Sequence, residues 1–91
     1  MQEPVYVAWL DCSSDVEAKI NSKHGVTLDE AREAIMYPSR LRRAVWDEDP
    51  ERGRRLIARG VTRSGRVIQA VLYPVDPADG VWRLGTALDL T

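Results

Sequence analysis

The spacing of apolar residues changes at Pro38, and this change constrains the fold more than any other feature of the chain. Before Pro38 the apolar residues recur at the spacing of an amphipathic helix, with one stripe formed by Leu28, Ala31, Ala34 and Ile35. After Pro38 the residues alternate, which is typical of strands. The alternation predicts one strand face with Leu41, Arg43 and Val45 and another with Arg42, Ala44 and Trp46.

Two capping boxes mark where helices begin. Ser14 with Glu17 and Thr27 with Glu30 each place a hydroxyl and a carboxylate at the spacing that satisfies two backbone donors. The first helix is therefore predicted over residues 15–23, with Gly25 as its left-handed cap and with Val16 and Ile20 facing inward. The second helix must end before Pro38.

Five strands and three connections complete the prediction. Strands are expected over residues 5–10, from residue 41 to 46, and over residues 55–61, 66–73 and 81–88. Residues 47–53 and 74–80 are predicted to be loops, and residues 62–65 a tight connection with Gly65 available for a positive φ. The order β-α-α-β-β-β-β predicts a single α+β domain over residues 1–91, with a mainly antiparallel sheet and two helices on one face.

Composition narrows the cellular setting. Cys12 is the single cysteine among 91 residues, so no intrachain disulfide can form. No apolar run approaches a membrane span, and the N-terminus does not read as a secretion signal. We therefore expect a cytoplasmic protein without a membrane partner. Exposed strand edges on so short a chain predict a homodimer or a tight complex with a partner protein.

The arginines are concentrated in the middle of the chain. Residues 40–66 contain nine arginines and four carboxylates, a net charge of +5 in a chain whose overall charge is −1. Guanidinium groups bind phosphate oxygens well, because they are planar, permanently charged and bidentate. The alternative is a solvated strand face on which arginine stems cover apolar neighbours. Composition leaves both interpretations open.

Lys23-His24-Gly25 is the sharpest local feature. Histidine transfers protons near neutral pH, although this pair would equally well complement the C-terminal end of a helix. One histidine and one cysteine do not form a tetrahedral metal site, and neither a metal nor another cofactor is expected. An arginine-lined sheet with a histidine and carboxylates is compatible with metal-independent RNA cleavage, in which the ribose 2′-hydroxyl attacks the adjacent phosphorus.

The stretch from Lys23 through His24, Gly25, Val26 and Thr27 to Ala31 resembles the signature of BrnT-type toxins. The likeness continues through Trp9 and through the segments at residues 37–40, 55–60, 65–68 and 82–87. The resemblance implies a RelE-like fold and an endoribonuclease of a type II toxin–antitoxin pair. The implied partners are RNA and a cognate antitoxin protein.

The chain departs from the family pattern at Leu88, where relatives have an arginine, and at Ile20, where they often have a polar residue. Relatives also continue into a charged C-terminal helix, whereas this sequence ends at Thr91. A second hypothesis follows from these departures: a catalytically inactive BrnT-like module that binds nucleic acid or a partner protein.

Under the ribonuclease hypothesis, Arg59 and Arg83 hold the scissile phosphate and His24 assists proton transfer. Five further cations are expected to bind RNA: Lys23, Arg42, Arg55, Arg63 and Arg66. Arg83 is expected to project from the open sheet face, because strand alternation groups it with Val81 and Gly85. The other face of that strand would carry Trp82, Leu84 and Thr86.

Overall fold

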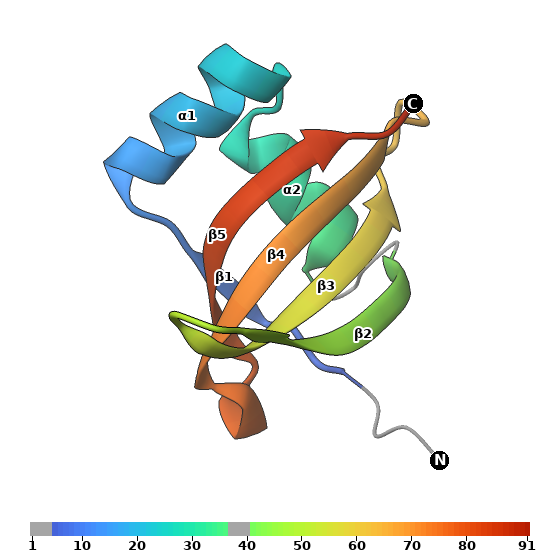
Figure 1. The fold of residues 1–91 in the computed structure, drawn as a ribbon. Coiled ribbons are helices and arrows are strands. Elements are labelled where there is room, and N and C mark those ends of the chain that lie inside the picture. Colours follow the sequence, from blue (N-terminus) through green and yellow to red (C-terminus); the bar gives the residue numbers. More distant parts are fainter. Residues whose placement is uncertain (1–4, 37–40) are drawn as a thin grey trace.

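The described residues form two α-helices that cover one face of a five-stranded sheet, so the protein is of the α+β class (Figure 1). A computed structural model describes residues 5–36 and 41–91. The elements in chain order are β1 (Trp9–Asp11), α1 (Ser14–His24), α2 (Leu28–Ile35), β2 (Leu41–Asp49), β3 (Gly53–Val61), β4 (Val67–Asp76), the 3₁₀ helix η1 (Pro77–Asp79) and β5 (Val81–Asp89). This order differs from the predicted one by η1, which stands between β4 and β5.

The strand order in the sheet is β1-β5-β4-β3-β2. The strands β2 to β5 form antiparallel neighbours in chain order, whereas β1 returns to the far edge and pairs with β5 in parallel. The short strand β1 and the long strand β2 are therefore the two edges. Within the described residues, no helix is long and apolar enough to cross a membrane.

The helix ends follow local capping chemistry. Ser13, not the predicted Ser14, caps α1: its backbone is extended and its hydroxyl accepts a hydrogen bond from the Val16 N–H at 3.2 Å. Gly25 ends α1 in the left-handed conformation with φ 63°, as predicted. The capping box at Thr27 and Glu30 is confirmed. The helix α2 ends at Ile35, and Tyr37, Pro38, Ser39 and Arg40 lie outside the described residues.

Small residues let α2 lie close to the sheet. Ala31 and Ala34 of α2 are fully buried, as is Ala58 of β3. Gly60 lies directly beneath the helix, because a Cβ at this position would be 2.0 Å from the Ala34 carbonyl oxygen. Around this contact the core is completed by larger side chains, among them Leu10, Ile20, Val26, Ile35, Leu56, Ile68, Leu72, Trp82 and Leu84.

The first strand is shorter than predicted. Residues 5–8 do not join the sheet, because β5 begins only at Val81, opposite Trp9. Just before this point the Gly80 carbonyl accepts hydrogen bonds from the backbone N–H groups of Ala8 and Trp9. The strand prediction for residues 5–10 is therefore wrong for its first four residues, although Val7 is buried in the core.

The two predicted loops are partly strand. The polar stretch 47–53 continues β2 to Asp49 and begins β3 at Gly53, so the connection shrinks to residues 50–52. Polar residues belong in this hairpin because Asp47 lies directly opposite Arg55 and the two form an ion pair. Likewise β4 runs on to Asp76, with Pro74 next to a register shift, where a missing N–H is tolerated.

Two irregularities change which residues share a face. A register shift between Leu41 and Arg43 places Leu41 opposite Gly60, so Leu41 packs against the core and not beside Arg43 as predicted. A second register shift lies between Val71 and Leu72 of β4, where Gly85 of β5 is the extra residue, and it places Thr86 opposite Val71. Because directly opposed residues lie on one face, Thr86 is on the open face and not with Trp82 and Leu84.

Replacement of Gly60 tests the close contact between α2 and the sheet. We expect Gly60→Ala to lower the free energy of unfolding by about 3 kcal/mol, because backbone atoms of α2 must move to admit the methyl group. Gly25→Ala is the matched comparison: nothing lies within 4 Å of its Cβ, and only its left-handed backbone costs about 1 kcal/mol. Urea unfolding of both variants checks the prediction, and equal losses would show that α2 does not depend on Gly60.

Candidate anion-binding face

No described element covers the sheet face opposite the helices, and this open face carries most of the charged strand residues. On β3 the buried residues Leu56, Ala58 and Gly60 face the helices, so Arg55 and Arg59 point the other way. Residues that are paired directly across neighbouring strands lie on the same face of a sheet. The partners of Arg55 and Arg59 on β2 therefore share this face, and so do Arg83 of β5 and Asp11 of β1. The charged members of the open face are Asp11, Arg43, Asp47, Asp49, Arg55, Arg59 and Arg83.

Arg55 is neutralised within the chain. Its guanidinium forms ion pairs with Asp47 at 2.8 Å and with Asp49 at 3.4 Å. Hydrogen bonding to Asp47 raises the pKa of Arg55, and the backbone N–H of Glu51 is the first cause that lowers the pKa of Asp49. Arg55 therefore has two carboxylate partners where the sequence predicts a contact with RNA.

Arg66 fastens the helices to the end of the sheet. It forms ion pairs with Glu30 of α2 and with Asp89 of β5, the latter at 2.8 Å, and it donates a hydrogen bond to the Gly25 carbonyl at 3.0 Å. These hydrogen bonds to Asp89 and Glu30 raise the pKa of Arg66. Hydrogen bonds from Thr91, together with Arg66, lower the pKa of Asp89 to about 2. Arg66, which the sequence predicts to bind RNA, thus makes contacts that hold both helices to the sheet.

Arg59 and Arg43 lie directly opposite each other on β3 and β2. Arg59 donates a hydrogen bond to the neutral side chain of Gln69 at 2.9 Å. Neither arginine has an ion pair within residues 5–36 and 41–91. Two like charges opposed across a strand pair repel each other, so an anion or an acidic partner would stabilise this position.

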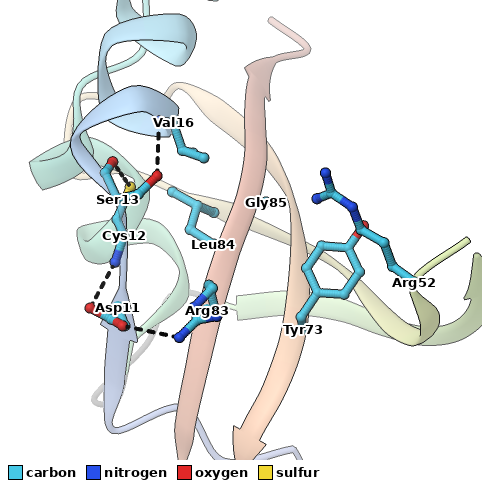
Figure 2. Close-up of a pocket in the computed structure, with 9 residues that line it drawn as sticks. All are labelled: Asp11, Cys12, Ser13, Val16, Arg52, Tyr73, Arg83, Leu84 and Gly85. Carbon is cyan, nitrogen blue, oxygen red and sulfur yellow. Dashed lines mark hydrogen bonds and ion pairs between the residues drawn. The ribbon is translucent and has the colours of Figure 1, made fainter.

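Arg83 lies at the other end of the face. Its guanidinium is 3.8 Å from the Asp11 carboxylate, and the two side chains are 61% and 56% exposed. An ion pair so exposed contributes little to stability, and water or another anion competes for it readily. Figure 2 shows Arg83 extending from β5 toward Asp11, as expected for a residue on the open face.

The structure does not bring Arg59 and Arg83 to one point. Arg59 is opposite Gln69 and Arg83 is opposite Tyr73, so the two arginines are four residues apart along the strands and two strands apart across them. This separation is roughly 16 Å, given rises of about 3.3 Å per residue and strand spacings of about 4.8 Å. The pair therefore suits two phosphates of one chain better than the single scissile phosphate of the prediction.

A pocket of about 440 Å³ opens beside Arg83 (Figure 2). The N-terminal end of α1 and the strands β4 and β5 form its walls, and the connection after β2 contributes Arg52. The guanidinium of Arg52 lies 5.7 Å from the centre of the Tyr73 ring. The complete lining is Asp11, Cys12, Ser13, Val16, Arg52, Tyr73, Arg83, Leu84 and Gly85.

Arg52, Tyr73 and Asp11 were missed by sequence reasoning. Arg52 lies in the connection between β2 and β3, within the predicted loop, and its position over Tyr73 has no signal in the local sequence. The alternation along β4 could have placed Tyr73 on the open face, because Ile68, Ala70 and Leu72 are buried at every second position and Tyr73 follows Leu72. The parallel return of β1 beside β5 has no local signal in the sequence, so the contact between Asp11 and Arg83 could not be found.

Lys23 and His24 lie away from this pocket. Both are exposed at the C-terminal end of α1, next to Gly25, whose carbonyl is held by Arg66. Arg66 in turn pairs with Asp89, six residues beyond Arg83 on β5, or roughly 20 Å along the strand. The predicted catalytic residues His24, Arg59 and Arg83 are thus distributed over three places.

The remaining predicted cations stand on the periphery. Arg42 is exposed at the register shift that begins β2. Arg63 is exposed in the turn between β3 and β4, where its backbone N–H donates to Glu33 of α2.

In the described part of the chain, no group of three or more histidines, cysteines and carboxylates could hold a metal ion. Burial raises the pKa of the Cys12 thiol, so Cys12 is not an activated nucleophile.

Replacement of Asp89 tests the bonds that Thr91 and Arg66 make to this carboxylate. The pKa of Asp89 is lowered from 3.8 to about 2, so its stabilising effect is complete above pH 3.8 and is lost as the pH falls through about 2. We expect Asp89→Asn to reduce stability at neutral pH and to lose less further stability in this acid range than the unmodified protein. Asp79→Asn, at an exposed carboxylate in η1, is the control. Urea unfolding across this pH range measures both effects. Parallel curves of unfolding free energy against pH for all three proteins would contradict the stabilising role of Asp89.

No protein-family model matches the chain. No curated protein matches it, and no solved structure does. The likeness to BrnT-type toxins therefore stays a prediction from the sequence motifs, and any assignment of function depends on the residues of the open face.

Proposed function

We propose that this protein binds RNA along the open face of its sheet. The observation that carries the proposal is the state of the cations there: Arg59 has a neutral partner, and Arg83 and Arg52 border a pocket with one weakly held carboxylate. Each of these guanidinium groups is available to a phosphate without breaking a close ion pair. Arg55, by contrast, is already neutralised.

The spacing of the cations favours a chain of phosphates over a single small anion. The separation of roughly 16 Å between Arg59 and Arg83 exceeds the size of one phosphate group. Single-stranded nucleic acids bind to surfaces that combine such a cationic track with aromatic side chains. Tyr73, on the wall of the pocket, supplies the aromatic group between Arg52 and Arg83.

The motif resemblance extends this proposal to a cytoplasmic toxin-like module with a RelE-like fold and a cognate antitoxin partner. Two versions of the module remain. In one, the bound RNA is cut by a metal-independent mechanism with His24 as the group that transfers a proton. In the other, the protein binds RNA without cutting it. The distance between His24 and the pocket favours binding as the core of the proposal.

Arginine replacements test the binding face. We expect Arg59→Ala and Arg83→Ala each to weaken binding of a labelled single-stranded RNA about fivefold, because each removes a cation that neutralises a phosphate. Each variant should also reduce the slope of log K against log salt concentration by about 0.7. Fluorescence anisotropy at several salt concentrations measures both quantities, and thermal unfolding should show that Arg83→Ala folds normally.

Arg54→Ala is the matched control. Arg54 is a neighbour of Arg55 on β3, but its guanidinium stacks 3.8 Å from the centre of the Trp46 ring, away from the open face. It removes the same charge from the chain, so its RNA affinity should stay close to that of the unmodified protein. Equal losses in all three variants would indicate attraction by net charge alone, and absence of binding at low salt would refute the proposal.

Cleavage is tested separately from binding. The unmodified protein and His24→Ala are incubated with the same RNA in the presence of a metal chelator. Cutting that His24→Ala abolishes would support the ribonuclease version. Binding without cutting, together with normal growth on induced expression, would support the binding module. Growth arrest that a neighbouring gene product relieves would support the antitoxin partner.

A further inference from the structure

The edge strand β2 carries a charge pattern that is complementary to itself. After Leu41 the strand continues with Arg42 and Arg43, and it ends with Asp47, Glu48 and Asp49; Ala44, Val45 and Trp46 lie between the two groups. In a second copy of the strand that runs in the opposite direction, each basic end would meet an acidic end. The midpoint of the pattern is Val45.

The outer edge of β2 is available for such pairing. The strand pairs with β3 on one side, and no other described strand pairs with it on the other. It is nine residues long, and Val45 and Trp46 at its centre are 36% and 38% exposed. A long edge with exposed apolar residues at its centre is a template for another strand. The register shift at Arg42 distorts the start of β2 and leaves the part from Arg43 onward regular.

Symmetry restricts the register of two antiparallel copies. A two-fold axis perpendicular to the sheet requires one residue to oppose itself, because hydrogen-bonded and non-bonded pairs alternate along the ladder. With Val45 on the axis, Arg43 opposes Asp47 and Arg42 opposes Glu48, and each pair occurs twice. With Trp46 on the axis, Arg43–Asp49 is the one complementary pair that remains, and with Ala44 on the axis Leu41 would oppose Asp47. The charges therefore select Val45.

The surroundings of Arg43 support this register. Within the chain Arg43 faces Arg59 across the β2–β3 pair, and the described residues provide it with no carboxylate. The opposing Asp47 of a second copy would supply one. Asp47 already binds Arg55 at 2.8 Å, so it would be shared between two arginines. On the other face of the strand, the small Ala44 would oppose the large Trp46, which fills space without a clash.

We infer that two copies of this chain associate through antiparallel pairing of their β2 edges, with Val45 at the two-fold axis and Arg43 of each copy paired with Asp47 of the other. The contact joins the two sheets into one continuous sheet. It is a small interface, so the dimer forms and dissociates with protein concentration. The inference does not depend on RNA binding, because it uses residues and a readout of its own.

A lysine at the axis tests the pairing. Val45→Lys places two like charges against each other at the centre of the interface and should raise the dimer dissociation constant at least about tenfold. Val75→Lys is the control, because Val75 is 53% exposed near the end of β4, outside β2. Sedimentation equilibrium over a wide concentration range measures the constants, and circular dichroism shows that both variants are folded.

Charge reversal tests the register. Arg43→Glu and Asp47→Lys should each weaken self-association, because each creates like-charged pairs at both ends of the interface. A mixture of the two variants should associate again, because Glu at position 43 of one chain meets Lys at position 47 of the other, and the remaining pair keeps its natural charges. Arg43→Glu is expected to keep its fold, since its new carboxylate faces Arg59 within the chain.

Three results would overturn the inference. The unmodified protein could remain monomeric at the highest concentration, as expected if the β2 edge serves a strand of a different protein. Val45→Lys could dimerise as well as Val75→Lys, which would place the contact on another surface. The mixed charge variants, both folded, could fail to associate, which would exclude the register centred on Val45.

Discussion

The close contact between α2 and the sheet determines how the rest of the molecule is arranged. Alanines on the helix and Gly60 on β3 bring backbone against backbone, so little space is left for side chains between them. With α2 in this position, its capped N-terminus brings Glu30 to Arg66, and Arg66 reaches Gly25 at the end of α1. Both helices are thereby held on one face. No described element covers the other face, and that asymmetry is the origin of the open face on which we place RNA.

The arginines that cluster in the sequence differ in the contacts that the fold gives them. Arg66 and Arg55 have close carboxylate partners, and Arg54 stacks on Trp46. An arginine that holds two carboxylates is costly to redirect toward a ligand, because the carboxylates would be left without their counter-charge. Arg59, Arg83 and Arg52 carry no such cost, which is why we place RNA on them. The local net charge of a segment therefore overstates the charge that it can offer to a partner.

Sequence patterns predicted most helices and strands, but they did not indicate which side chains the fold brings together, and the difference has a physical reason. The end of α1 at Gly25 and the start of α2 at Thr27 depend on residues within one helical turn. The alternation along β3 depends on which residues are buried locally. Both features can therefore be predicted from the sequence. The extension of β2 to Asp49 depends on cross-strand pairing with Arg55, and the approach of Asp11 to Arg83 depends on a parallel return across the whole sheet. Register shifts at Arg42 and Gly85 then decide which side chains share a face. Contacts between distant segments formed the site, and these carry no short-range signal.

The two proposals are connected by geometry, although neither depends on the other. A two-fold axis perpendicular to the sheet leaves the open faces of both copies on the same side of the joined sheet. Pairing of Arg43 with Asp47 of a second copy would neutralise the arginine nearest the edge and relieve its repulsion with Arg59. Arg59 would then stand beside the joint in each copy, with Arg83 and the pocket farther out. A dimer would therefore present two equivalent tracks to one RNA, and binding to both tracks would exceed the affinity of either.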